Sequence, residues 1–142
     1  MAYNILVVDD SLPMRSVIKK TIKASGVNVG KLFEVSNGRD ALALLKKEWL
    51  DLVLVDYNMP NMNGLEFIAE MKKDELLKSI PVIMTTVEGS RQRIKEFIEK
   101  GATDYIKKPF TPEEARDKLY KVIGGATDGE ASSYTGDEAL DF

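Results

Sequence analysis

Short apolar runs alternate along this chain with longer segments in which apolar residues recur at helical spacing. Five runs rich in Val and Ile have the length of strands: NILVV (residues 4–8), KLFEV (31–35), DLVLV (51–55), PVIMTT (81–86) and DYIK (104–107). Nearly continuous apolar runs are typical of parallel strands that are buried on both faces by helices. The pattern therefore predicts an α/β fold, a doubly wound five-stranded parallel sheet with five helices.

The segments between the runs carry the signals of amphipathic helices. Four apolar faces are predicted: Val17, Ile18 and Ile22; Ala41, Leu44 and Leu45; Leu65, Ile68 and Met71; and Ile94, Phe97 and Ile98. A fifth helix is predicted to begin after Thr111, which can form a capping box with Glu114 and is followed by Pro112. Ser90 is the predicted N-cap of the fourth helix. Left-handed helix ends are predicted at Gly26, Gly101 and Gly124.

Composition narrows the chemistry that the chain can perform. Its 142 residues include no Cys and no His, which excludes a Cys nucleophile, a Ser-His-Asp triad and a phosphohistidine. Catalysis would have to rely on carboxylates, Lys, hydroxyls or a metal ion. The missing Cys, the lack of a signal peptide and the shortness of the apolar stretches predict a cytoplasmic protein with no membrane partner.

Charge divides the chain into a body and a tail. Residues 126–142 hold five acids and no base, so the net charge of −3 for the whole chain leaves +2 on residues 1–125. The segment 126–142 is small, polar and acidic, and we expect it to be a flexible tail. Residues 1–125 are predicted to form one domain. Because this domain lacks a sustained basic run, we expect no nucleic-acid partner.

Polar residues stand at the ends of the predicted strands. In chain order these are Asp9 and Asp10, then Asp56, then Thr85 and Thr86, and finally Lys107 and Lys108. Ligands of open α/β sheets bind beyond the carboxyl ends of the strands, at the point where the strand order reverses. We therefore expect three carboxylates, a hydroxyl and an ammonium group to converge at one edge of the sheet.

Three neighbouring carboxylates require a cation. Two carboxylates about 4 Å apart repel by roughly 4 kcal/mol at an effective dielectric constant near 20. A ligand set made of oxygen atoms suits Mg²⁺, and such Mg²⁺ sites typically serve phosphoryl chemistry. The sequence therefore predicts a Mg²⁺ site in which Asp56 is the nucleophile that attacks phosphorus and becomes an acyl phosphate.

Four motifs in this order, LVVDDS, VDYNMPNMNG, PVIMTT and KKPF, resemble the receiver domain of bacterial two-component response regulators. The resemblance runs from about residue 4 to residue 123. Because no DNA-binding or enzymatic domain follows, the chain is most similar to the single-domain, CheY-like chemotaxis regulators. The resemblance implies a flavodoxin-like sheet with strand order 2-1-3-4-5. It also implies a signalling module that catalyses its own phosphorylation and slow dephosphorylation.

The resemblance assigns roles to the acidic residues. It implies that Asp56 is the phosphoacceptor and one of the Mg²⁺ ligands. Asp10 would ligate Mg²⁺ directly, and Asp9 would hold it mainly through water. The backbone carbonyl of Asn58 would add a further ligand.

The resemblance also implies a switch. Lys108 would contact the phosphoryl oxygens, and its peptide bond to Pro109 is expected to be cis. Thr86, thirty residues after Asp56, would be the switch hydroxyl that moves toward the phosphoryl group. Tyr105 would be the aromatic residue that turns inward when this hydroxyl moves.

Two positions depart from the family pattern. Asn63 stands where an Asp is common, and it is expected to matter little because it lies in the loop after the site. Val87 follows the switch threonine in place of the usual Ala, Ser or Gly. We expect its branched side chain to crowd the route to the phosphoryl group and to alter the rates of phosphorylation and dephosphorylation.

The resemblance implies partners as well. These are a histidine kinase of the CheA kind, the flagellar motor switch protein and a phosphatase, with the protein itself a monomer. One alternative is a receiver that acts as a phosphate sink in another pathway. Another is a Mg²⁺-dependent phosphatase or phosphotransferase of the haloacid dehalogenase kind, although such enzymes place Asp-x-Asp at the first strand. A flavin site is a third alternative, but an acidic pocket repels a phosphate unless a metal intervenes.

Overall fold

Strands and helices alternate strictly along the computed structural model, which describes residues 2–124. The elements are β1 (Tyr3–Val8), α1 (Leu12–Ala24), β2 (Val29–Val35), α2 (Gly38–Leu45), β3 (Leu52–Asp56), α3 (Gly64–Lys72), β4 (Val82–Thr86), α4 (Arg91–Glu99), β5 (Asp104–Lys107), α5 (Pro112–Leu119) and the π-helical turn η1 (Tyr120–Gly124). The predicted tail, residues 126–142, lies outside the described residues.

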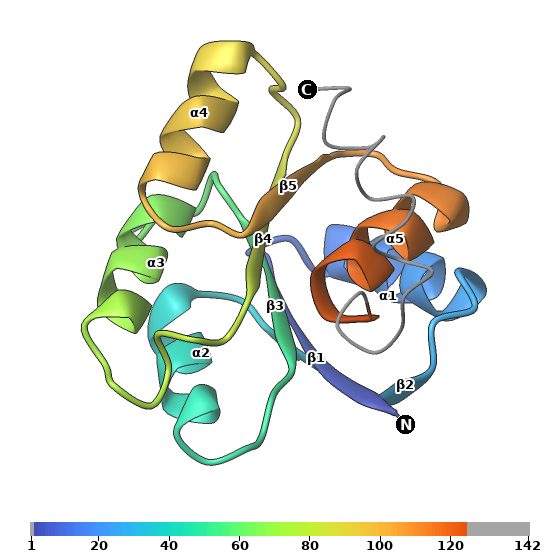
Figure 1. Cartoon of the computed structure of the whole chain (residues 1–142), viewed down its shortest axis with the longest axis horizontal. Helices are drawn as coiled ribbons and strands as arrows, with labels where there is room; N and C mark the ends of the chain where they lie inside the picture. The colour runs from blue at the N-terminus through green and yellow to red at the C-terminus, as the bar shows by residue number, and fades with distance from the viewer. Residues whose placement is uncertain (1, 125–142) are drawn as a thin grey trace.

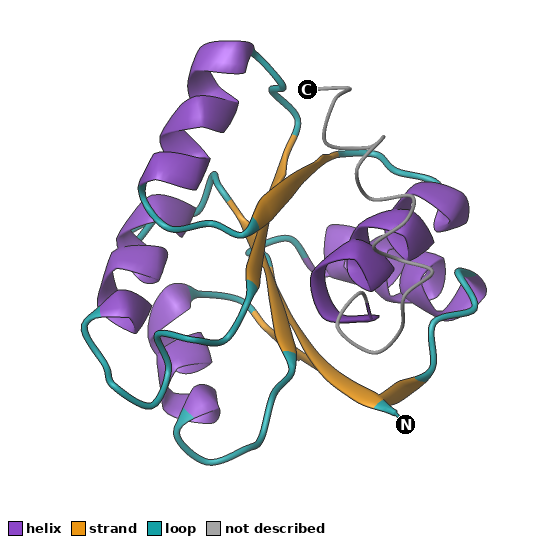
Figure 2. Ribbon diagram, in the orientation of Figure 1, coloured by secondary structure: helices purple, strands orange, loops and turns teal. Residues whose placement is uncertain are grey.

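All strand pairs are parallel, and the sheet has the order β2-β1-β3-β4-β5. Helices α1 and α5 cover one face of the sheet, and α2, α3 and α4 cover the other (Figures 1 and 2). The predicted fold class and strand order are therefore confirmed. The strand order reverses between β1 and β3, so a ligand crevice is expected at the carboxyl ends of these two strands.

Successive residues of one strand enter different cores. Leu6 and Val8 of β1 pack with α2, α3 and α4, whereas Ile5 and Val7 pack with α1 and α5. The same division holds for β3, in which all five residues are buried. Because neighbouring side chains of a strand point to opposite faces, a strand covered on both faces needs an unbroken apolar run. This requirement explains why the acids of β1 and β3 stand at, or directly after, the carboxyl ends of these two strands.

Helix ends follow the signals in the sequence. Thr111 and Glu114 form the predicted capping box, and Ser90 caps α4. Gly26 and Gly101 have the predicted positive φ angles, +89° and +117°. Asn63 also caps its helix, in a capping box with Glu66 at the start of α3. Asn and Asp are equally good N-caps, which explains why Asn is tolerated at this position.

The prediction is wrong for two residues of the apolar faces, which are exposed in the structure. Val17 of α1 is 51% exposed and Ile98 of α4 is 45% exposed. In α1 the buried residues are Ile18 and Ile22, spaced by one turn, so the buried stripe is narrower than the apolar one. Phe97 fills the core position of α4.

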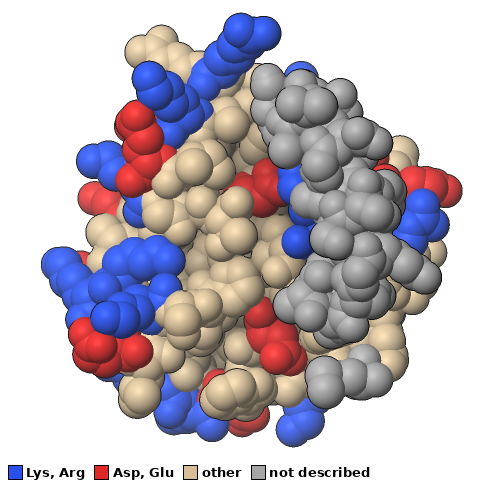
Figure 3. Space-filling view, in the orientation of Figure 1, with Lys and Arg blue, Asp and Glu red and all other residues tan. Residues whose placement is uncertain are grey.

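Charged side chains of both signs lie next to one another on the side of the molecule formed by α3 and α4 (Figure 3). Examples are the ion pairs Lys73–Glu70 and Arg93–Glu96. Among residues 2–124, no helix is long and apolar enough to cross a membrane.

The first turn of α3 packs directly on the end of β3, and this contact leaves no room for a side chain at Gly64. A Cβ atom there would lie 2.9 Å from the backbone oxygen of Asp56 and 3.1 Å from Cα of Tyr57. We expect Gly64→Ala to lower the free energy of unfolding by about 1–3 kcal/mol, because backbone must move to relieve the overlap.

Urea unfolding of purified protein measures this change. Gly89→Ala is the matched control, because its Cβ would meet only the flexible Lys107 side chain at 3.4 Å. We expect the control to change stability by less than about 0.5 kcal/mol. Equal stabilities for the two variants would show that the backbone at the β3–α3 contact can move without a loss of stability.

Candidate functional site at the carboxyl edge of the sheet

Three carboxylates meet where β1 and β3 end. Asp9 and Asp10 directly follow β1, and Asp56 is the last residue of β3. One oxygen from each of these three residues lies within 4.8 Å of the others. Asp9 and Asp56 are buried, whereas Asp10 is exposed. The structure thus brings together the three acids that the sequence predicted, at the point where the strand order reverses.

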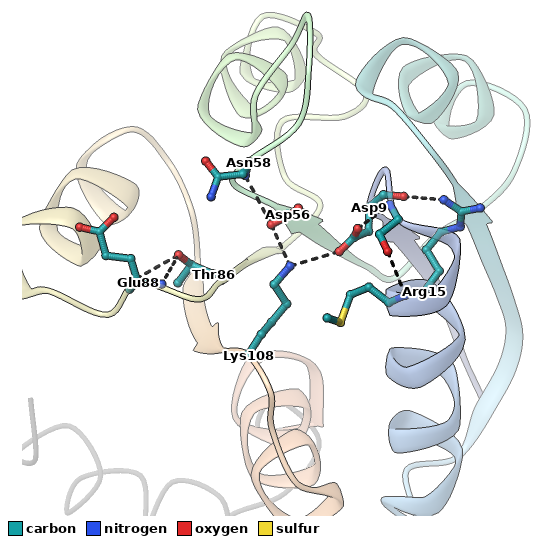
Figure 4. Close-up of polar contacts among 9 residues, drawn as sticks. Asp9, Arg15, Asp56, Asn58, Thr86, Glu88 and Lys108 are labelled. Carbon is teal, nitrogen blue, oxygen red and sulfur yellow. Dashed lines mark hydrogen bonds and ion pairs between the residues drawn. The ribbon is translucent and has the colours of Figure 1, made fainter.

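Lys108 joins two of these acids. Its Nζ lies 3.0 Å from Oδ1 of Asp56 and 3.3 Å from Oδ2 of Asp9, and its side chain is only 8% exposed (Figure 4). The lysine follows β5, and its backbone N–H donates to the carbonyl oxygen of Thr86 at 2.7 Å. The Lys108–Pro109 peptide bond is cis, as expected. An ammonium group in this position partly neutralises two buried carboxylates.

The environment of Asp56 acts on its ionisation in both directions. Burial raises the pKa of this carboxyl above its usual range, and the charge of Asp9 acts in the same sense. Hydrogen bonding and charge attraction from Lys108 oppose this rise. The backbone N–H of Asn58 also donates to Oδ1 of Asp56, at 3.4 Å (Figure 4). Asn58 therefore lies in the loop beside the acids, as the metal-ligand prediction requires.

The loop that carries Asp9 and Asp10 is held by residues that the sequence analysis missed. Arg15 of α1 donates from Nη1 to the carbonyl oxygen of Asp9 at 2.6 Å, and its Nε pairs with Glu34 of β2 at 2.9 Å. The backbone N–H of Ser11 donates to Oδ1 of Asp9 at 2.9 Å. A single Arg in a helix and a single Glu in a strand carry no spacing signal, so only their approach in three dimensions identifies them.

The hydroxyl of Thr86 lies at the end of β4 but is bonded to its own loop. Its Oγ1 donates to the carbonyl oxygen of Glu88 and accepts from the N–H of Glu88, both at 3.0 Å (Figure 4). Its neighbour Thr85 stands opposite Asp56 in the β3–β4 register. Val87 is 59% exposed, and its effect on phosphorylation rates stays a prediction.

Tyr105 lies on β5, the strand next to Thr86. It is half-buried, and burial raises the pKa of its phenol. The ammonium of Lys118 lies 4.4 Å from the centroid of its ring. In the β4–β5 register, Tyr105 stands opposite Met84, two residues before Thr86. Tyr105 and Thr86 therefore occupy adjacent strands, which the predicted coupling between them requires.

The donor set has the chemistry of a Mg²⁺ site. Its side-chain ligands are carboxylate oxygens, two of them fixed by the sheet and one facing solvent. Such a set suits a hard cation that keeps several of its waters. A cation held there would lie beside a buried carboxylate and a lysine, an arrangement that can stabilise charge on a phosphoryl group.

Known proteins share both the sequence and the fold. The sequence matches the response regulator receiver domain family over residues 5–120. It is 40% identical over 119 residues to the chemotaxis protein CheY-3 of Vibrio cholerae, an alignment that covers 84% of this chain and 90% of the relative. The solved structure of the chemotaxis response regulator CheY4 of V. cholerae is 32% identical in sequence, with a TM-score of 0.77, and the match covers 87% of this chain and all of that one.

A further receiver domain shares the fold alone. It belongs to a sensor histidine kinase of Pseudomonas aeruginosa, is 24% identical with a TM-score of 0.76, and covers 87% of this chain and 99% of that one. A magnesium ion is coordinated in the active-site cleft of that structure. The family match spans most of the chain, and the alignment covers nearly the whole length of the relative CheY-3, a chemotaxis protein. The chain therefore belongs to the response regulator receiver domain family, with CheY chemotaxis regulators among its relatives.

Proposed function

We propose that this protein is a phosphorylation-activated switch whose Asp56 receives a phosphoryl group from a histidine kinase. The observation that carries the proposal is the buried Lys108 ammonium between Asp9 and Asp56, at the carboxyl edge of the sheet. Phosphorylation-dependent signalling is the function of the family to which the chain belongs. We assign the receiver domain to residues 1–125 and regard residues 126–142 as a tail outside it.

The transfer step uses the Asp56 carboxylate as nucleophile. A carboxylate oxygen attacks the phosphorus atom, a new O–P bond forms, and the P–N bond to the kinase imidazole breaks. The electron pair of that bond stays on the imidazole nitrogen, which takes up a proton, and Asp56 becomes an acyl phosphate. We expect Lys108, whose Nζ lies 3.0 Å from Asp56, to contact the phosphoryl oxygens.

Mg²⁺ is the proposed cofactor, held by Asp9, Asp10, Asp56 and the backbone carbonyl of Asn58. When bound, it neutralises negative charge on the transferring phosphoryl oxygens. The three acids of this chain supply oxygen ligands that fit such an ion. The magnesium ion in the cleft of the P. aeruginosa receiver domain supports the assignment.

Phosphorylation would act on the loops that flank the site. The hydroxyl of Thr86 leaves Glu88 and bonds to the phosphoryl group, and Tyr105 turns inward behind it. The surface formed by α4, β5 and α5 then changes its affinity for a partner, which is a shift between two populated states.

The names of the relatives indicate the pathway. The similarity to chemotaxis proteins supports a CheA-like kinase as phosphodonor, the flagellar motor switch protein as target and a phosphatase that ends the signal. We place the protein in the cytoplasm as a monomer.

The first prediction from the proposed function concerns the metal site, in which Asp10 is the exposed carboxylate. We expect Asp10→Asn to raise the free energy of unfolding, measured without divalent cations, by about 1 kcal/mol, because it removes the repulsion between Asp10 and the two other carboxylates. The gain is small because solvent already screens this exposed charge. The same change should reduce the stabilisation that Mg²⁺ gives. Urea unfolding with and without Mg²⁺ measures both effects. The control Glu99→Gln alters an exposed acid at the end of α4, and an equal Mg²⁺ response in both variants would contradict the assignment of Asp10.

The second prediction concerns Asp56. Incubation with acetyl phosphate should label the protein only when Mg²⁺ is present, and the label should decay because acyl phosphates hydrolyse. Asp56→Asn should lose most of the label, since an amide is a poor nucleophile. Intact-protein mass spectrometry measures the added phosphoryl group. Labelling of Asp56→Asn at the wild-type rate would end the acyl-phosphate proposal. The control Asp51→Asn, just before the start of β3, should label normally.

The third prediction separates signalling from metal binding at Lys108. We expect Lys108→Ala to keep the Mg²⁺ dissociation constant within about tenfold of wild type, roughly 1.4 kcal/mol, since the acids that hold the ion remain. Phosphorylation should no longer change binding of a motor switch peptide. Calorimetry gives the first value and fluorescence anisotropy the second. Lys47→Ala, an exposed lysine before β3, is the control, and a Lys108→Ala protein that switches normally would refute the role.

A further inference from the structure

Arg93 of α4 contacts both of the loops that flank Asp56. Its Nη1 donates a hydrogen bond to the phenol oxygen of Tyr57, the residue that follows Asp56. Its Nε lies 3.5 Å from Oε1 of Glu88, in the loop after Thr86. Its Nη1 also lies 3.4 Å from Oε1 of Glu96, on the next turn of α4. One guanidinium group thus joins the β3–α3 loop, the β4–α4 loop and α4.

The Tyr57 end of this connection is fixed. The backbone N–H of Tyr57 donates to Thr85 of β4 at 3.0 Å, and its carbonyl oxygen accepts from Gly64 of α3 at 3.0 Å. Its ring centroid lies 5.3 Å from that of the fully buried Phe97 and 4.7 Å from the guanidinium carbon of Arg93. Tyr57 therefore provides a rigid anchor, tied to the core on three sides.

The Glu88 end lies in the exposed loop between β4 and α4, and it holds the Thr86 hydroxyl. Both hydrogen bonds of that hydroxyl go to the backbone of Glu88. If the hydroxyl turns toward a phosphoryl group on Asp56, both bonds break, and the backbone of Glu88 is released. Any contact that fixes Glu88 therefore opposes the movement of Thr86.

We propose that Arg93 is a positioning residue that clasps Glu88 to Tyr57 and so holds the Thr86 hydroxyl away from Asp56. This inference rests on the proposed function, because it assigns the restraint that phosphorylation must overcome. The clasp stabilises the state present without phosphate, and the side-chain contacts of Arg93 described above do not include Asp9, Asp10 or Asp56. It should therefore lower the affinity for a phosphoryl group without altering the affinity for Mg²⁺.

The chemistry of arginine suits this role. A planar guanidinium group offers several N–H donors in a fixed fork, and it can donate to a phenol and to two carboxylates at once. The ammonium of a lysine is a compact charge without this planar fork, so we do not expect it to keep all three contacts. Arg93→Lys should therefore keep only part of the restraint.

Beryllium fluoride tests the clasp, because it binds to a carboxylate oxygen as a tetrahedral mimic of a phosphoryl group. We expect Arg93→Met to bind it, with Mg²⁺ present, about three- to tenfold more tightly than wild type, which is the range for a partly exposed ion pair and one hydrogen bond. The Mg²⁺ dissociation constant alone should stay within about twofold. The methyl NMR signal of Thr86 in free Arg93→Met should shift toward its position in the beryllium fluoride complex, a change that a purely structural role would not produce.

Two further variants make the test specific. Arg91→Met removes an exposed arginine from the same turn of α4 and should behave like wild type. Tyr57→Phe keeps the ring and removes the phenol oxygen, so it should tighten binding of beryllium fluoride in the same direction. Arg93→Met combined with Tyr57→Phe should add little to Arg93→Met, because both changes open one clasp. Thermal unfolding of each variant is measured to check that the fold is retained.

The possible outcomes separate the two proposals. Equal affinities for Arg93→Met and Arg91→Met, or fully additive effects of Arg93→Met and Tyr57→Phe, would overturn the clasp and leave the proposed function intact. A wild-type protein that fails to bind beryllium fluoride with Mg²⁺ would overturn the proposed function and the clasp together.

Discussion

The ammonium group of Lys108 allows two carboxylates to lie buried side by side, and the site depends on this one interaction. Its Nζ reaches Asp56 at 3.0 Å and Asp9 at 3.3 Å, so that it joins the ends of β1 and β3 to the segment after β5. Burial of an unpaired charge costs several kcal/mol. The three segments must therefore be held in fixed positions, and the rest of the fold supplies that rigidity.

The sheet provides the rigidity because both of its faces are covered. Alternate residues of β1 and β3 enter two separate apolar cores, one against α1 and α5 and the other against α2, α3 and α4. No described residue of β3 is exposed. A strand with no solvent face cannot shift its register without exchanging both cores. The carboxylate of Asp56 is therefore fixed as firmly as the core itself.

The loops beside the site are built differently. Thr86 is held by hydrogen bonds to Glu88, and Glu88 is held by Arg93 through a partly exposed ion pair. The ion pair is weak, because solvent screens partly exposed charges. A rigid carboxylate bordered by a weakly held loop has the properties that the proposed switch needs, because a ligand on the carboxylate can change the loop without disturbing the sheet.

The sequence alone was enough to predict the elements and the acids and lysine of the proposed site. Apolar runs identified the strands, and Thr111, Ser90 and Gly101 marked helix ends, because these signals act between residues close in the chain. Asp9, Asp56 and Lys108 were found because parallel strands end at one edge. Only the tertiary structure showed that Val17 is exposed, that Arg15 holds Asp9 and that Arg93 joins Tyr57 to Glu88. Those facts depend on the relative placement of helices and strands, and no local pattern encodes a contact between side chains 36 residues apart.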